Sequence, residues 1–449
     1  MSTATERLLA YQGTAECYSV SDDEVRDLQI AAIDERLQDR IDKIDLVGLR
    51  AREAGIDKIE SLQDVVPLLL PHTAYKSYPE SFLNGEKWDK LSKWLSTVSS
   101  ASLDKIGLDN VDGIDGWVSR LEEAGYYLSC SSGTTGKAAM LLSSPADLAW
   151  PSADNIAACT WATGLAPAQD RLFFSLAPVA KVARNDVIKR EIARAYGKPE
   201  NSPFSLPTPP ITIGSILEMI GLRKAIADGT ASPSMVAEYE TKSHERETAI
   251  EHAIDETVDA LIAARGEKLF LMGMWGPLYQ IAVRIRERGF SAKDFQPHNM
   301  MYVGGGLKRA AVPDNYREVV YDTFAVDPAH NYQLYSMQEI NTVMPRCHEG
   351  GRYHVPPWLV CLTLNQDGDE LVDNRQGEVR GRACFFDLSM DARWGGVISG
   401  DRIDVDFSPC KCGARSPSIR DNVVRYADLE GDDKIRCSGT VDAYVRGVA

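Results

Sequence analysis

The chain has 449 residues, 44% of them hydrophobic and 25% charged, and its formal net charge is −16 at pH 7. This length predicts roughly two or three packed units, and an acidic balance spread along the chain argues against nucleic acids and anionic membranes as partners. The sequence contains neither a run of about eighteen apolar residues nor a basic-then-apolar leader, so we expect no membrane span and a cytoplasmic location.

The first eighty residues carry a helical pattern followed by a proline-containing segment. Acidic residues follow Ser21, as is usual at the positive end of a helix. Apolar residues then recur at helical spacing from Val25 to about Val47. We therefore expect helical structure from Ser21 to about Val47, followed by a proline-containing segment over residues 65–82.

The second half of the chain contains short apolar runs separated by glycines. Residues 154–264 mix such runs with helical spacing, and later runs have the composition of β-strands. These runs occupy residues 269–276, 300–306, 331–339, 358–364 and 377–386. Helices that alternate with apolar strands favour a layered α/β fold.

Residues 131–137 read Ser-Ser-Gly-Thr-Thr-Gly-Lys and lie between two apolar stretches that are readable as strands. Glycines let a backbone approach a ligand closely, hydroxyl and N–H groups can wrap an anion, and a lysine adds charge suited to phosphate. The spacing differs from the Walker pattern. The segment is thus either a phosphate-binding loop or an ordinary polar turn.

This loop resembles the phosphate-binding loop of adenylate-forming enzymes, the superfamily of acyl-CoA synthetases, luciferases and peptide-synthetase adenylation domains. Three further stretches resemble motifs of that superfamily in the expected order. Residues 304–306 resemble its glycine strand, 335–339 its aromatic-Gly-x-Thr-Glu motif, and 399–401 its Thr-Gly-Asp motif. Four weak signals in the right order make the resemblance specific.

Two other segments indicate which branch of the superfamily the chain resembles. Residues 71–82 and the cysteine pair within 408–417 resemble the phenylacetate–CoA ligase branch, near the acyl-protein synthetases of bacterial luminescence and the aryl-acid AMP-ligases of antibiotic pathways. The resemblance implies an α/β fold with a large layered core, in which helices pack on mixed β-sheets, plus a small β-rich subdomain. The expected segments are an N-terminal helical segment (1–80), an α/β core (81–340), a β-rich subdomain with a zinc knuckle (341–438) and a hinge remnant (439–449).

The resemblance also implies ATP and Mg²⁺ as cofactors and assigns roles to residues. Lys137 and Thr134 would act on the phosphates, Glu339 would hold Mg²⁺, and either Arg420 or Arg425 would assist at the ribose. The nucleotide would be contacted by Ser131, Ser132, Gly133, Thr135, Gly136, Gly304, Gly305, Gly306, Tyr335, Ser336 and Asp401.

Bulky aromatic residues near the glycine strand suggest the nature of the acid. Trp275 and Tyr302, together with Gly305, would line an acyl pocket, and core packing is the alternative for Trp275. If the rings line the pocket, a flat aryl acid is favoured over a long alkyl chain.

The nine cysteines do not form a disulfide framework in a chain of this length. Cys347, His354, Cys410 and Cys412 suit a closed tetrahedral Zn²⁺ site. His348 is a competing ligand, and free buried thiols are the alternative. The resemblance favours a structural zinc, because some relatives carry a cysteine-rich knuckle at this place.

We expect a ligase that forms an acyl-adenylate from ATP and a small aryl acid and passes the acyl group to an amine, a hydroxyl, CoA or a carrier protein. An aryl-CoA ligase of the phenylacetate type is the nearest alternative, and homodimer formation is left open. Ala139, Gln338 and Thr440 depart from the usual motifs, and only residues 443–449 follow the hinge-like segment 439–442, where relatives have a mobile lid domain. These departures keep open a degenerate nucleotide-binding protein without turnover.

Overall fold

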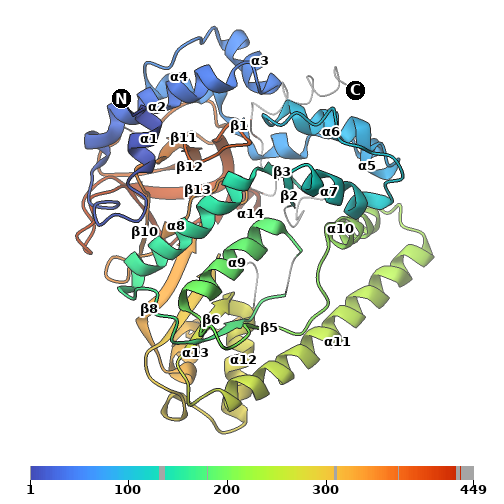
Figure 1. Ribbon diagram of the computed structural model, residues 1–449, viewed down its shortest axis with the longest axis vertical. Helices are drawn as coiled ribbons and strands as arrows, with labels where there is room; N and C mark the ends of the chain where they lie inside the picture. Colours follow the sequence, from blue (N-terminus) through green and yellow to red (C-terminus); the bar gives the residue numbers. More distant parts are fainter. Residues whose placement is uncertain are drawn as a thin grey trace. The chain divides into compact units, whose positions relative to one another are not determined.

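The computed structural model describes residues 2–130, 137–178, 181–307, 311–372, 374–430 and 435. Its contacts divide the chain into two compact units. Unit 1 comprises Met1–Ser131, Ala138–Asp154 and Ser336–Ala449, and unit 2 comprises Ser132–Lys137 and Asn155–Tyr335. The predicted hinge remnant, 439–449, lies outside the described residues. The α/β class predicted from the sequence is confirmed (Figure 1).

Unit 1 is built on a largely antiparallel sheet with the strand order β10-β14-β13-β12-β11, in which β1 and β15 also pair with β13. Strand β11 is buried over its whole length, and β12 is buried from Gly381 to Asp387, so both strands contribute to the core of the unit. The strands are β1 (Leu70–Pro71), β10 (Arg352–His354), β11 (Leu359–Leu364), β12 (Glu378–Asp387), β13 (Gly396–Asp406), β14 (Ser418–Arg420) and β15 (Val424–Arg425).

Unit 1 also contains a second pair of strands and several helices. A separate antiparallel pair is formed by β2 (Tyr127–Cys130) and β3 (Met140–Ser143). The helices are α1 (Ala4–Leu9), α2 (Asp22–Arg40), α3 (Asp45–Ala54), α4 (Leu62–Val65), α5 (Glu80–Asn84), α6 (Trp88–Thr97), α7 (Gly113–Glu123) and α14 (Tyr426–Glu430), with short 3₁₀ turns η1 (Val66–Leu68) and η2 (His72–Lys76) and the short strand β9 (Met344–Pro345). Helix α8 (Pro145–Thr163) begins in unit 1 and continues into unit 2.

The helical pattern from Ser21 to about Val47 corresponds to two helices, α2 and the start of α3. Ser21 and Glu24 form a capping box at the start of α2, as the acidic start signal suggested. The helix ends at Arg40, and the chain turns before α3. At Gly48 a Cβ atom would lie 2.4 Å from the carbonyl oxygen of Ile41, so a glycine is needed where the two helices meet. Apolar spacing alone does not reveal this turn.

The predicted segments 1–80 and 341–438 belong to one compact unit. The reason is a long-range pairing: β1 lies parallel to β13, with Leu70 opposite Val397 and Pro71 opposite Ile398. The N-terminal helices are therefore part of the same unit as the β-rich segment.

Unit 2 contains a parallel sheet with the order β5-β4-β6-β7-β8. Its core packs Leu271 and Met301 of the sheet against Trp275, Leu278 and other apolar residues of the helices. The strands are β4 (Leu172–Ser175), β5 (Phe204–Ser205), β6 (Leu269–Gly273), β7 (Asn299–Gly304) and β8 (Val326–Tyr335). The helices are α9 (Ala183–Tyr196), α10 (Ile213–Ala227), α11 (Pro233–Ala263), α12 (Trp275–Glu287) and α13 (Tyr316–Phe324), with the 3₁₀ turn η3 (Ala292–Asp294).

The parallel arrangement places the carboxyl ends of β4, β6, β7 and β8 along one edge of the sheet. Ligands of open α/β sheets bind at that edge. Among the residues that the structure describes, no helix has the length and apolar character needed to cross a bilayer.

Candidate functional site

The predicted phosphate loop connects two paired strand ends. Cys130 at the end of β2 lies opposite Met140 at the start of β3. The loop residues expected to hold phosphate lie outside the described residues: Ser131, Ser132, Gly133, Thr134, Thr135 and Gly136. Lys137 is described and half-buried. The next residue is anchored, because the hydroxyl of Tyr78 donates a hydrogen bond of 3.0 Å to the carbonyl oxygen of Ala138.

In unit 2, several predicted nucleotide and acyl residues gather at the carboxyl edge of the parallel sheet. Gly304 ends β7 and Tyr335 ends β8. Gly305 follows with φ of 76°, a left-handed backbone that favours glycine. A Cβ atom at Gly306 would meet nothing within 4 Å, and one at Gly304 only the ring of Tyr302, at 3.7 Å. These glycines therefore keep backbone accessible to a ligand.

The two aromatic residues expected in the acyl pocket differ in their surroundings. Trp275 is 1% exposed and belongs to the apolar core of unit 2, with its ring edge-on to Tyr316 and Tyr321. Its packing matches the core alternative, so it offers no surface to a substrate. Tyr302 is buried next to the glycines, and its hydroxyl donates a hydrogen bond of 2.8 Å to the side chain of Asn155.

In unit 1, the segment 336–343 carries the predicted magnesium ligand. The hydroxyl of Ser336 donates a hydrogen bond of 2.9 Å to the carbonyl oxygen of Thr342, which closes the segment on itself. Burial raises the pKa of the Glu339 carboxyl, the positive charges of Arg393 and Lys76 oppose that shift, and the charge of Asp401 adds to it. The predicted magnesium and ribose carboxylates thus lie within electrostatic reach of each other.

Only one of the two arginines proposed for the ribose lies beside Asp401. Asp401 of β13 lies opposite Arg425 of β15 in the strand register, and the Arg425 Nε is 3.9 Å from the Asp401 Oδ1. Arg420 of β14 instead donates a hydrogen bond of 2.7 Å from its Nε to Glu378. Of the two, Arg425 is the one beside Asp401.

Several buried charged residues that the sequence analysis did not single out surround the segment 336–343. Asp387, Asp147 and Arg393 are each at most 1% exposed. Their oxygen atoms and guanidinium nitrogens hydrogen-bond to this segment or to the turn that follows β12. The spacing of Ser144 and Asp147 at the start of α8 was a usable capping signal, since each side chain bonds the backbone N–H of the other.

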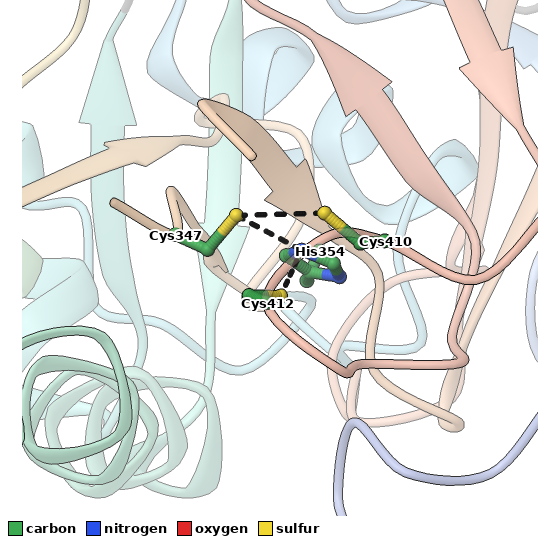
Figure 2. A group of neighbouring side chains, drawn as sticks. All are labelled: Cys347, His354, Cys410 and Cys412. Carbon is green, nitrogen blue, oxygen red and sulfur yellow. Dashed lines mark hydrogen bonds between the residues drawn. The ribbon is translucent and has the colours of Figure 1, made fainter. Parts of the chain in front are cut away.

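The predicted zinc ligands lie together in unit 1 (Figure 2). The ligand atoms of Cys347, His354, Cys410 and Cys412 all lie within 4.8 Å of one another. Cys347 Sγ is 3.7 Å from Cys410 Sγ, and His354 Nε2 is 3.3 Å from Cys347 Sγ and 3.4 Å from Cys412 Sγ. The competing candidate, His348, is not part of the group.

These distances fit a tetrahedral ion. With Zn–S bonds of about 2.3 Å, the sulfurs of a tetrahedral site lie about 3.8 Å apart. A Cβ atom at Gly350 would meet Cys410 Sγ at 2.2 Å, so the turn between Cys347 and His354 needs a glycine. Burial raises the pKa of Cys412 to about 12, and burial together with the charge of Arg352 lowers the pKa of His354 to about 4. A neutral imidazole is ready to bind metal, whereas the thiols must release protons.

The chain is similar to solved structures of a ligase. It matches 2-hydroxyisobutyryl-CoA ligase in the postadenylation state in complex with R3-HIB-AMP, with a TM-score of 0.57, 12% identity and coverage of 95% of this chain and 73% of that one. An open conformation of the same ligase in complex with 2-HIB-AMP and CoA matches with a TM-score of 0.54, 11% identity and coverage of 94% and 74%. No family model and no curated protein matches the chain. The similarity establishes that the chain has the fold of an adenylate-forming ligase.

Proposed function

We propose that the chain is an ATP-dependent AMP-ligase that activates a small aromatic carboxylic acid as an acyl-adenylate and then passes the acyl group to an acceptor. The observation that carries this proposal is the ligase fold over 95% of the chain, together with acids at two motif positions, Glu339 and Asp401. The resemblance to antibiotic-pathway ligases supports a role in secondary metabolism.

The reaction brings two anions together, so charge and orientation govern it. A carboxylate oxygen attacks the α-phosphorus of ATP, and the bond from that phosphorus to the bridging oxygen breaks as pyrophosphate leaves. We assign Lys137 to the phosphates and Glu339 to the Mg²⁺ that neutralises them. Asp401 accepts hydrogen bonds from the ribose hydroxyls, with Arg425 beside it, and Tyr335 offers a ring to the adenine.

The acid would lie along the carboxyl edge of the parallel sheet in unit 2. Gly304–Gly306 leave room there, and Tyr302 borders them. The Tyr302 ring meets that of Tyr332 edge-on, with centroids 5.0 Å apart. Both rings are buried, so the preference for a ring-bearing acid rests on the resemblance to aryl-acid ligases, with Tyr302 as the aromatic residue beside the glycines.

We further propose that the cluster of Cys347, His354, Cys410 and Cys412 binds a structural Zn²⁺. Four protein ligands fill a tetrahedral ion and leave no position for a substrate. Cys347 follows the segment that carries Glu339, and Cys410 follows the strand that carries Asp401. A bound ion would therefore tie together the two segments on which the proposed magnesium and ribose contacts depend.

Exchange of labelled pyrophosphate into ATP tests the activity. With a panel of aryl and alkyl acids, exchange should depend on one acid class, and mass spectrometry should detect the matching acyl-AMP. Exchange that no acid stimulates would contradict the proposal and favour the degenerate nucleotide-binding protein.

A CoA ligase is the second candidate, because a structure with this fold is a CoA ligase in complex with CoA. Adding CoA to the complete reaction separates the two candidates. A thioester formed at the rate of acyl-AMP consumption would identify a CoA ligase. Persistence of acyl-AMP in the presence of CoA would favour an amine, a hydroxyl or a carrier protein as the acceptor.

A further inference from the structure

Arg393 is a buried cation attached to the segment that carries Glu339. It lies in the turn between β12 and β13, and it is 1% exposed. Its Nη1 donates a hydrogen bond of 3.0 Å to the carbonyl oxygen of Glu339, and its Nη2 donates one of 3.2 Å to the carbonyl oxygen of Gln338. One guanidinium therefore holds two consecutive peptide groups.

The guanidinium is itself held in place. It lies 5.6 Å from the centroid of the Tyr75 ring, a cation–π distance, and its Nη2 is 3.9 Å from the sulfur of Met390. A planar fork with several fixed donors suits two adjacent acceptors, which a single ammonium group cannot match.

A carboxylate holds the other end of the same segment. One oxygen of Asp387 accepts hydrogen bonds from the backbone N–H groups of Asn341, at 2.8 Å, and Thr342, at 2.9 Å. Its other oxygen accepts from Ser389. The carbonyls at residues 338–339 thus face a cation and the amides at 341–342 face an anion, so the backbone on both sides of Glu339 is clamped.

Buried carbonyl oxygens need hydrogen-bond donors, and this need alone could explain a buried arginine. The location of these two carbonyls gives the contact a further consequence. The carbonyl of Glu339 belongs to the residue assigned to Mg²⁺, and fixing that peptide fixes the direction in which its side chain leaves the backbone. Sites of this kind depend on supporting residues that hold a ligand in position before substrate arrives.

We propose that Arg393 is a positioning residue that sets the backbone of Glu339 for binding of Mg²⁺ with ATP. This inference rests on the proposed function, because it assumes that Glu339 meets the phosphate-bound ion. It predicts that weakening the Arg393 contacts changes the magnesium requirement rather than the affinity for metal-free ATP.

The test compares Arg393→Lys with Glu339→Gln and with a matched control, Arg171→Lys. Arg171 is also buried and also donates to a backbone carbonyl, that of His298, but it lies at the amino end of β4 in unit 2. For each protein, calorimetry measures ATP binding with and without Mg²⁺, pyrophosphate exchange gives the Mg²⁺ concentration for half-maximal rate, and thermal unfolding gives stability.

Arg393→Lys should raise that Mg²⁺ concentration roughly tenfold, because a charged hydrogen bond to the Glu339 peptide is lost. Glu339→Gln should shift it in the same direction, and high Mg²⁺ should partly rescue both variants. Arg171→Lys should lower the unfolding temperature without moving the magnesium requirement. If Arg393→Lys behaves like this control, the inference is wrong.

The test must also cover a variant that does not fold and a wild-type protein without a magnesium response. If Arg393→Lys does not fold, Arg393→Gln replaces the guanidinium by a shorter, uncharged amide that cannot hold both carbonyls, and an unchanged magnesium requirement in that variant overturns the inference. If the wild-type protein itself binds ATP no better with Mg²⁺ than without it, the proposed function fails together with the inference. A normal wild-type response with an unaltered Arg393→Lys overturns the inference alone.

Discussion

Lys137 is the residue through which the predicted phosphate loop can be tested, since it is described by the structure and half-buried. Lys137→Ala should lower the pyrophosphate exchange rate about ten- to a hundredfold, because a charged hydrogen bond contributes about 1.5–3 kcal/mol. Exchange kinetics and thermal unfolding measure the two effects separately. Lys198→Ala is the control, because Lys198 forms a surface pair with Glu267. Equal rates in both variants would remove Lys137 from the mechanism.

The zinc proposal makes a prediction for single cysteines. Protein purified without added metal should contain about one zinc per chain, and Cys410→Ser should lower both the zinc content and the unfolding temperature, because a structural ion contributes folding free energy. Elemental analysis and thermal unfolding are the measurements. Cys159→Ala removes a buried thiol elsewhere and should leave the zinc content unchanged. Metal-free wild-type protein with undiminished stability would count against the site.

At the scale of residues, the sequence can point to uncommon residue types such as cysteine and histidine as candidate ligands. It cannot point to charged residues whose role depends on their burial in the folded chain. Cysteines and a histidine near one another in two short segments are unusual enough to suggest a metal site, and the structure brings those side chains together. Arg393 and Asp387 look like ordinary charged residues of a polar turn in the sequence. Only the folded chain puts them against the segment 336–343. The choice between Arg420 and Arg425 depends on strand register, which a single sequence does not determine.

At the scale of elements, local patterns were more informative than distant pairings. The apolar runs predicted as strands are present as β6, β7, β8, β11 and β12. The apolar spacing continues across the turn into α3, so it does not reveal that α2 ends at Arg40. The pairing of β1 with β13 joins segments more than three hundred residues apart in the sequence, and loop closure of that length leaves no local signal.

The start of α2 offers a test of a buried ion pair. Asp22 is 6% exposed at its side chain and pairs with Arg375 and with Arg26. Burial alone would raise the pKa of the Asp22 carboxyl, but the hydrogen bonds and charges of both arginines outweigh it and lower the pKa. The pair therefore adds stability above the unfolded-state pKa of about 4, and this stability is lost as the pH falls through the lower folded-state pKa.

Asp22→Asn should lower the free energy of unfolding at pH 7 by about 3 kcal/mol, since it leaves a buried arginine without its anion. It should also flatten the loss of stability below about pH 4. Denaturant unfolding over a pH series measures both. Asp23→Asn is the neighbouring control, because its side chain is 80% exposed. An Asp22→Asn protein with the acid sensitivity of the wild type would show that the pair does not stabilise the fold through its charge.

At the scale of the whole molecule, ordered short motifs were sufficient to indicate the fold, which the similarity to 2-hydroxyisobutyryl-CoA ligase confirms. Sequence identity of 12% is too low to carry residue roles from that protein. The length predicts two or three packed units, but it does not indicate which stretches form each unit, because each is assembled from separate parts of the chain. The phenylacetate-like branch and the identity of the acid remain predictions.

The stability of the whole molecule can distinguish an enzyme from a degenerate binding protein. A ligand that binds only the native state raises the free energy of unfolding by about 2.7 kcal/mol at a hundred times its Kd. Mg²⁺ with ATP, and separately a non-hydrolysable analogue of the acyl-adenylate, should each raise the unfolding temperature, and the analogue should do so at lower concentration because it fills both the nucleotide and the acyl positions. Asp401→Asn should weaken both effects, whereas Asp369→Asn, an exposed acid outside the proposed site, should not. Stabilisation by ATP without any gain from the analogue would favour the degenerate protein, and no stabilisation by either ligand would contradict nucleotide binding altogether.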